Sequence, residues 1–506
     1  MRPVSSERLT HQPAEPAERK HGPGMGVAVL AVVLAAALVR LLAARGDLWL
    51  DEIWTLDMLA QLKSPLEILT RLHHDNNHVL NSIVLWCLRG LNNDFALRLP
   101  AVFCGSLAVA AAAWSGALGD ADLAASAHAR ERPDLPPAAR ALAAALLVGG
   151  SYLLVHYGSE ARGYAYAVGF GLLAFACAQR GALAPRRRWA FAYGACALLA
   201  LLGHALAAHL MTGVACWSFA RSWRRGLRGI ALLRAFALWN TLPLVGTAVF
   251  YFGFLRRVEI GGGPRESVLP VLGRAVAYAC GLPLGWGTGL LLGAALLVVG
   301  AGLFALARRG ADIGWAFLVT ILVSPMALRA FQPSELNFER YFVLSAAFGL
   351  LLVARLLGFV AARGRAGALV ATLLALVVVG GSGPRIGRLL AEQRGHYREA
   401  LGMMLSASPG ARVSVSSDHD FRNGLLLRHY AERLGALERV AYLPQASWEG
   451  DGPDWFIEHR LEGRPGPADA LQDPLGNRYT LYAEYPSAPL SGFRWYLFKR
   501  VERVGQ

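Results

Sequence analysis

Long apolar runs separated by short polar breaks dominate the chain from Gly24 to Gly383. A helix needs roughly 20 apolar residues to cross the hydrocarbon of a bilayer, and a spanning segment must satisfy its own backbone groups. We therefore predict a continuous α-helical membrane region that crosses the bilayer eleven times. The predicted spans are 25–45, 98–118, 138–156, 163–179, 189–203, 205–220, 231–254, 287–307, 313–330, 340–360 and 366–383.

Arginine clusters orient these spans. They fall at mutually consistent positions if all are cytoplasmic, as the positive-inside rule expects. The clusters are 186–188, 221–228, 308–309 and 363–365. With the N-terminus inside, the external segments are those after Arg45 and after Pro384, the break at 157–162, and the loops 256–266 and 332–340.

Two shorter apolar pieces, 79–91 and 269–282, do not fit the alternation of inside and outside loops. Either of them would reverse every later loop if it crossed alone, so we predict that both are juxtamembrane or re-entrant helices. A total of thirteen crossings is the alternative.

The texture changes after Pro384 to mixed polar sequence, which predicts a small extracytoplasmic α/β domain. Its expected strands are 411–417, 439–443, 455–458, 479–485 and 495–499, with a helix at 421–434. The chain is thus divided into a cytoplasmic tail (1–24), a membrane region (25–383) whose first external loop is 46–97, and the external domain (384–506).

Composition supports a membrane protein and excludes other classes. The 506 residues are 55% hydrophobic and 17% charged, more apolar sequence than one water-soluble core buries. The net charge of +15 sits largely in the arginine clusters and therefore indicates topology instead of nucleic-acid binding. The six cysteines stand singly in apolar stretches, so neither disulfides nor zinc fingers are expected. We predict a multi-pass protein of the bacterial inner membrane.

Adjacent carboxylates, Asp51 and Glu52, follow the first span between large apolar residues. Neighbouring residues on a helix point in different directions, so one carboxylate can face a reacting centre while the other binds a backbone group or a cation. We predict Asp51 as a general base that deprotonates an acceptor hydroxyl. The alternative is a helix cap whose charges compensate the helix dipole.

The same loop continues with a dense polar run that could bind phosphate or sugar hydroxyls or be a plain solvated loop: His73, His74, Asp75, Asn76, Asn77 and His78. His74 and His78 could supply two metal ligands if the stretch is helical, but no third ligand is clear. We therefore predict no metal site, although assistance by a divalent cation is left open. His204 and His209, in an apolar helix pair, are expected to serve packing or polar contacts within the bundle and not ligand binding.

Two further polar elements lie on the same predicted side. Glu160 and Arg162 occupy one external break, and Arg340 with Tyr341 begins a late span. A guanidinium at this depth suits a phosphate, which it can bind bidentately; a snorkelling arginine is the alternative for each. Together with Asp51 they suggest an inverting displacement in which a base-activated hydroxyl attacks an anomeric carbon and a lipid phosphate leaves, stabilised by cations.

These elements resemble the membrane glycosyltransferases of the GT-C type, in the branch of protein O-mannosyltransferases and the lipid A aminoarabinose transferase. The resemblance runs in order through roughly residues 25–383. It is carried by Asp51-Glu52, by 77–81 where many members have His-Pro-Pro or Lys-Pro-Pro, by Arg98-Leu99-Pro100-Ala101, by 159–164 and by Arg340-Tyr341. The proline pair is absent here, and Glu160 with Arg162 stands where some relatives place an Asp.

The resemblance implies a GT-C transmembrane domain with a polyprenyl-phosphate sugar as donor, Asp51 as catalytic base, and Arg162 and Arg340 as ligands of the donor phosphate. The acceptor would be a lipid, glycan or protein on the extracytoplasmic side. A secondary transporter or lipid flippase is the main alternative, but such proteins tend to contain internal repeats, and the chain has no evident duplication. A non-catalytic scaffold with a sensing domain is the third.

Overall fold

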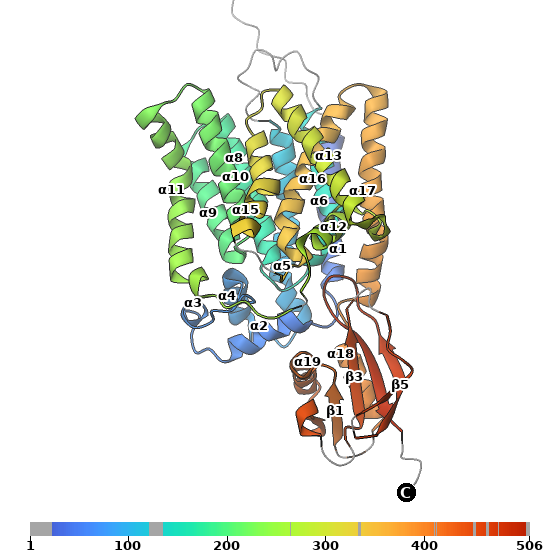
Figure 1. Ribbon diagram of the computed structural model, residues 1–506. Helices are drawn as coiled ribbons and strands as arrows, with labels where there is room; N and C mark the ends of the chain where they lie inside the picture. The colour runs from blue at the N-terminus through green and yellow to red at the C-terminus, as the bar shows by residue number, and fades with distance from the viewer. Residues whose placement is uncertain are drawn as a thin grey trace, which may run out of the picture.

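The computed structural model describes residues 23–120, 135–263, 265–331, 335–408, 410, 412–448, 452–461, 465–473 and 475–501. Most of the predicted tail, residues 1–22, lies outside these ranges. The described part is a bundle of long apolar helices with a small mixed domain attached at one end (Figure 1). This confirms the predicted fold class of a polytopic α-helical membrane protein with a C-terminal α/β domain.

All eleven predicted spans are helical. They correspond to α1 (Pro23–Ala43), α5 (Asp94–Leu118), α6 (Pro137–Gly150) with α7 (Tyr152–Tyr157), α8 (Tyr164–Leu183), α9 (Arg187–Gly203), α10 (Ala207–Arg224), α11 (Gly229–Gly253), α13 (Gly287–Arg308), α14 (Gly314–Leu318) with a π-turn and α15 (Ser324–Phe331), α16 (Val343–Ala361) and α17 (Arg365–Glu392). Within the described ranges, eight helical stretches are long and apolar enough to cross a membrane. The shorter α6 and the helices α9 and α10 pack alongside them.

The two pieces that parity excluded are short helices, α4 (Val79–Leu88) and α12 (Val268–Cys280), of 10 and 13 residues. At 1.5 Å per residue neither can cross a hydrocarbon layer of about 30 Å alone. α2 (Leu50–Ala60), α3 (Glu67–Thr70) and α4 lie at the end of the bundle that carries the C-terminal domain (Figure 1).

The last long helix does not stop where the apolar pattern ends. α17 continues through Pro384 to Glu392, which a membrane helix tolerates because neighbouring groups satisfy the freed carbonyl. α18 (Tyr397–Ser406), which the sequence pattern did not indicate, follows and packs under α19 (Asp420–Arg433).

The C-terminal domain is built on a six-stranded mixed sheet with the order β2-β1-β3-β6-β5-β4. Its strands are β1 (Val413–Ser417), β2 (Val440–Tyr442), β3 (Trp455–Arg460), β4 (Ala470–Gln472), β5 (Arg478–Tyr485) and β6 (Arg494–Arg500). β1 runs parallel to β2 and β3, and the other neighbours are antiparallel. Along β3 the buried side chains Trp455, Ile457 and His459 alternate with more exposed ones, the period-2 pattern of a strand with one covered face.

Buried polar contacts fix this domain to the bundle. The fully buried Arg394, between α17 and α18, donates to the carbonyls of Ala43 and His156 at 2.8 Å each. The β5–β6 connection reaches the bundle as well, since the Tyr152 hydroxyl donates to the Pro489 carbonyl at 2.6 Å. The sheet domain is therefore anchored against the ends of α1 and α7.

Candidate active site

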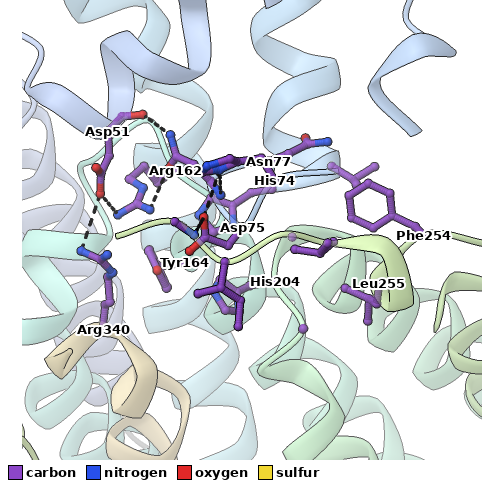
Figure 2. Close-up of a pocket in the computed structure, with 18 of the residues that line it drawn as sticks. Asp51, His74, Asp75, Asn77, Arg162, Tyr164, His204, Phe254, Leu255 and Arg340 are labelled. Carbon is purple, nitrogen blue, oxygen red and sulfur yellow. Dashed lines mark hydrogen bonds and ion pairs between the residues drawn. The ribbon is translucent and has the colours of Figure 1, made fainter. Parts of the chain in front are cut away.

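A cavity of about 210 Å³ opens where α2 meets the ends of the membrane helices. Its walls come from α2, from the 74–79 segment, from the residues around Arg162, from the α9–α10 turn, from the segment 250–262 and from Arg340 with Tyr341. Figure 2 shows these elements converging although they are far apart in the sequence.

Asp51 lies between two guanidinium groups at one side of this cavity (Figure 2). Its Oδ2 is 2.8 Å from Nη1 of Arg162 and 3.6 Å from Nη1 of Arg340. The three side chains are 12%, 3% and 16% exposed respectively, so their charges interact with little screening by solvent. Asp51, Arg162 and Arg340, which the sequence analysis placed on one side of the membrane, thus form one cluster.

The two arginines keep hydrogen-bonding capacity. Arg162 donates from Nη2 to Asn76 at 2.9 Å, and Arg340 lies over the ring of Phe338 at 3.9 Å. Among the described residues, the buried Nε atoms of Arg162 and Arg340 have no hydrogen-bond partner. A guanidinium has five N–H donors, so both arginines can donate hydrogen bonds to an additional anion.

Asn76 aligns Asp51 with Arg162. Its Nδ2 donates to the Asp51 carbonyl at 2.8 Å, while its Oδ1 accepts from the Arg162 guanidinium. The amide thereby connects the first turn of α2 to the second external break.

Glu52 is turned away from the cavity. It is fully buried, pairs with the Nε and Nη2 atoms of Arg98 at 2.8 and 2.5 Å, and accepts the backbone N–H groups of Ala161 at 2.7 Å and of Trp49 at 3.1 Å. Burial alone would raise the pKa of Glu52, but the Arg98 guanidinium outweighs it and holds this pKa below its ordinary value. The Glu52 carboxylate therefore caps the N-terminus of α2 from position N3 and pairs with the Arg98 guanidinium.

Arg98 ties this cap to the end of the first span. Its Nη1 donates to the Gly46 carbonyl at 3.1 Å and its Nη2 to the Asp47 carbonyl at 2.8 Å. The Glu52–Arg98 pair therefore joins the end of α1, the start of α2 and the start of α5. Because Ala161 precedes Arg162, the same pair also sets the position of a cavity residue.

Two other predicted site residues lie behind the cavity wall. Glu160 is fully buried and accepts from Nε1 of Trp49 at 2.6 Å and from the Ser491 hydroxyl of the β5–β6 connection at 3.2 Å. Burial raises the pKa of Glu160 against the opposing charge of Arg162. His73 packs against the ring of Phe254 with centroids 5.8 Å apart. Neither side chain lines the cavity.

The segment after α11 covers the histidine-rich loop. The two backbones pair where the Asp75 N–H donates to the Glu259 carbonyl at 3.0 Å and the Glu259 N–H donates to the His73 carbonyl at 2.8 Å. Gly261 then donates its N–H to the Asp75 carboxylate at 3.1 Å. A Cβ at Gly261 would come within 3.1 Å of His74, so glycine permits this close approach.

The other predicted residues of this loop, His74, Asn77 and His78, all border the cavity but make different contacts. His74 and His78 line the cavity. Asn77 also borders it, but its amide donates to the carbonyls of Ile68 and Leu72 at 2.8 and 2.7 Å, which fixes the loop.

The cavity wall also contains side chains to which the sequence analysis gave no individual role: Asp75 and Asn76 of the polar run, Tyr164 and His204. His204, expected to serve packing or polar contacts within the bundle, lies at the α9–α10 turn and packs against the Tyr164 ring with centroids 4.7 Å apart. It also lines the cavity. The polar residues near His204 in the cavity, Arg162 and Arg340, are distant from it in the sequence, so no local pattern indicates this position. His209, by contrast, bonds to Ser324 at 2.8 Å and does not border the cavity.

The environment of His204 predicts a pH-dependent stability. Burial, together with the charges of Arg162 and Arg340, lowers the pKa of His204 from 6.5 to about 3. Below pH 6.5 this histidine is protonated in the unfolded chain and stays neutral in the folded one. Its contribution to the free energy of unfolding is therefore fully present above pH 6.5 and is lost as the pH falls toward 3. Melting temperatures in detergent at pH 7 and pH 5 should differ less for His204→Gln than for the wild type. His396→Gln, outside the cavity, should keep the wild-type difference; if His204→Gln also keeps it, the inferred pKa is wrong.

No group of three or more His, Cys, Asp or Glu side chains that could hold a metal ion occurs in the described part of the chain. The charges beside Asp51 come from arginine.

Comparisons with known proteins found similarity at the level of structure. No protein-family model and no curated protein sequence matches the chain. Among solved structures, it is similar to apo ArnT from Cupriavidus metallidurans (13% identity, TM-score 0.49, covering 94% of this chain and 98% of that one). The same protein bound to undecaprenyl phosphate gives 12% identity and a TM-score of 0.47, with coverage of 96% and 100%. The archaeal oligosaccharyltransferase AglB from Archaeoglobus fulgidus, in complex with an inhibitory peptide and a dolichol-phosphate, gives 11% identity, a TM-score of 0.44 and coverage of 85% and 69%.

Proposed function

We propose that this chain is an inverting glycosyltransferase that moves a sugar from a polyprenyl-phosphate donor to a lipid, glycan or protein acceptor. The observation that carries the proposal is the contact of one carboxylate, Asp51, with the buried guanidinium of Arg162 and the half-buried guanidinium of Arg340, in a cavity at the end of a membrane bundle. We also propose that this end, with the C-terminal domain, faces the extracytoplasmic side of a bacterial inner membrane. The arginine clusters support that orientation.

In the proposed reaction, Asp51 acts as the general base, and the two arginines stabilise the leaving phosphate. Asp51 takes the proton of an acceptor hydroxyl, whose oxygen attacks the anomeric carbon from the face opposite the phosphate. The bond from that carbon to the phosphate oxygen breaks, and its electron pair leaves with the lipid phosphate. Arg162 and Arg340 stabilise this anion, which needs positive charge more than a proton.

Donor binding and base activation are coupled in this proposal. Arg162 and Arg340 contact the Asp51 carboxylate, and a donor phosphate competes with it for the same guanidiniums. As the arginines turn to the phosphate, the carboxylate loses its ion pairs and becomes a better proton acceptor. The base is therefore most active when a donor is bound.

A transfer assay tests the proposal. Purified protein in lipid nanodiscs is given a labelled polyprenyl-phosphate sugar and a membrane extract as the source of acceptors, with and without a chelator. We expect label to appear in an acceptor. We expect the chelator to have no effect, since arginines already provide the positive charge beside Asp51. Movement of the lipid across a bilayer without any transfer would establish the flippase alternative.

Removing one guanidinium should weaken donor binding. A charge-assisted hydrogen bond contributes about 1.5–3 kcal/mol, or roughly tenfold to 150-fold in affinity. Arg340→Gln should therefore raise the KM for the donor by about that factor, with a comparable loss of affinity for polyprenyl phosphate alone. Arg228→Gln, between α10 and α11 where the side chain bonds to the Trp223 carbonyl, is the matched control. An unchanged affinity in Arg340→Gln would remove this residue from the phosphate site.

A further inference from the structure

Three aromatic side chains form one wall of the cavity: His78, Tyr164 and His204. Their ring centroids lie 4.7 to 5.2 Å apart, and they come from the first external loop, the start of α8 and the α9–α10 turn. Figure 2 shows Tyr164 below Arg162, and the Arg162 guanidinium carbon lies 5.1 Å from the centre of the Tyr164 ring. A group bound here would lie next to the phosphate position.

Both imidazoles in this wall are uncharged. Burial lowers the pKa of His78 well below 6.5 and that of His204 to about 3, and the positive charges of Arg162 and Arg340 act in the same direction. Nδ1 of His204 accepts the Leu206 N–H at 3.1 Å. Its proton therefore resides on Nε2, which is a donor.

The wall has unused hydrogen-bonding capacity. Within the described residues, the buried Nε2 of His78 makes no hydrogen bond, and Tyr164 lines the cavity with a side chain that ends in a hydroxyl. Neutral N–H, ring-nitrogen and hydroxyl groups match sugar hydroxyls, which both donate and accept. The aromatic rings offer apolar faces to the C–H groups of a sugar ring.

The charged groups of the cavity are already engaged. Asp51 contacts the two arginines, and Asp75 lies 3.0 Å from Nδ1 of His74 while accepting the Gly261 N–H at 3.1 Å. Once the donor phosphate occupies the arginines, no lining guanidinium is left for a carboxylate on the sugar, and the two aspartates repel it. An ammonium on the sugar would pair with the Asp51 carboxylate once the donor phosphate has drawn the arginines away from it. That pairing would lower the basicity that the proposed general base needs.

The cavity is also small. Its volume of about 210 Å³ is below the roughly 300–1,000 Å³ of pockets that enclose drug-sized ligands. A cavity of this size encloses about one sugar ring, so a longer glycan would extend out of it.

We propose that the donor carries a single uncharged monosaccharide, which His78, Tyr164 and His204 recognise through its hydroxyl groups. This inference rests on the proposed transferase function and specifies the substrate class of the same site.

A panel of donors tests the substrate class. Polyprenyl phosphates carrying a neutral hexose, a neutral pentose, an amino sugar, a uronic acid or a disaccharide are compared in the transfer assay. We expect kcat/KM to be at least about tenfold higher for a neutral monosaccharide than for the other donors. Faster transfer of a charged sugar or a disaccharide would overturn the inference and leave the transferase proposal intact. Absence of transfer from every donor would overturn the transferase proposal as well.

Tyr164→Phe tests the wall itself, because it removes one hydroxyl and keeps the ring. Loss of one neutral hydrogen bond should raise the KM for the best neutral donor about threefold to tenfold. Inhibition by polyprenyl phosphate without a sugar should be unchanged. Tyr193→Phe is the matched control, since the Tyr193 hydroxyl is buried in α9 away from the cavity. An equal loss for the sugar-free lipid would assign Tyr164 to the phosphate instead and overturn its sugar role.

Discussion

Asp51→Asn is expected to lower the rate of sugar transfer by about 10²- to 10⁴-fold, the range that a positioned general base contributes. The amide keeps the size of the side chain but cannot take a proton from an acceptor hydroxyl. The donor should still bind, because Arg162 and Arg340 lose a competing anion. The measurements are single-turnover transfer rates and donor affinity for the wild type and the variant.

Asp57→Asn is the matched control for this experiment. Asp57 belongs to the same helix but pairs with Arg428 at 3.2 Å on an exposed surface, so its replacement should leave the rate within about twofold of the wild type. A transfer rate near the wild-type value in Asp51→Asn would remove this residue as the base.

Glu52→Gln is expected to destabilise the protein by about 3–5 kcal/mol, because removing one partner of a buried ion pair leaves the other charge uncompensated. Arg98 and Glu52 are both fully inaccessible to solvent, and no water can replace the lost carboxylate. The measurement is the loss of folded protein on heating in detergent, with transfer activity followed in parallel.

Glu67→Gln provides the comparison for Glu52→Gln. The Glu67–Arg71 pair, 3.4 Å apart, is partly exposed, and such pairs contribute about 0–1 kcal/mol. If Glu52→Gln were as stable as the wild type and yet inactive, Glu52 would act in the chemistry, as the acidic pair first suggested, and not only in holding α2.

The sequence predicted the helices well because the membrane imposes a simple rule. Apolar length alone marks a span, and arginine clusters such as 186–188 orient it. The end of α17 was misplaced, since Pro384 suggests a break that a membrane helix does not require. The short strand β4 was missed because it lies at the edge of the sheet and its residues are largely exposed, so no apolar alternation marks it.

The candidate site was predicted in part. Asp51, Arg162 and Arg340 stand out because a charge near the membrane is costly without a role. Their distances from one another, however, depend on the packing of α2, α8 and η6 (Glu339–Phe342), which no local pattern specifies. His204 was predicted to make packing or polar contacts within the bundle, because its apolar neighbours in the sequence are typical of such contacts.

Long-range contacts account for the remaining differences. Glu160 was a candidate for donor binding, but Ser491 and Trp49, which surround it, come from distant parts of the chain. The partner of Glu52 is Arg98, placed 46 residues away in the sequence. Only the folded arrangement distinguishes a carboxylate that lines the cavity from one that supports its wall.

The most direct test of the account is a structure of the protein with bound polyprenyl phosphate. We predict that the phosphate lies within hydrogen-bonding distance of both Arg162 and Arg340 and that the Asp51 carboxylate separates from them and borders open space for an acceptor. A phosphate bound elsewhere, with Asp51 still paired to the two arginines, would contradict the central claim that these three residues form one transfer site.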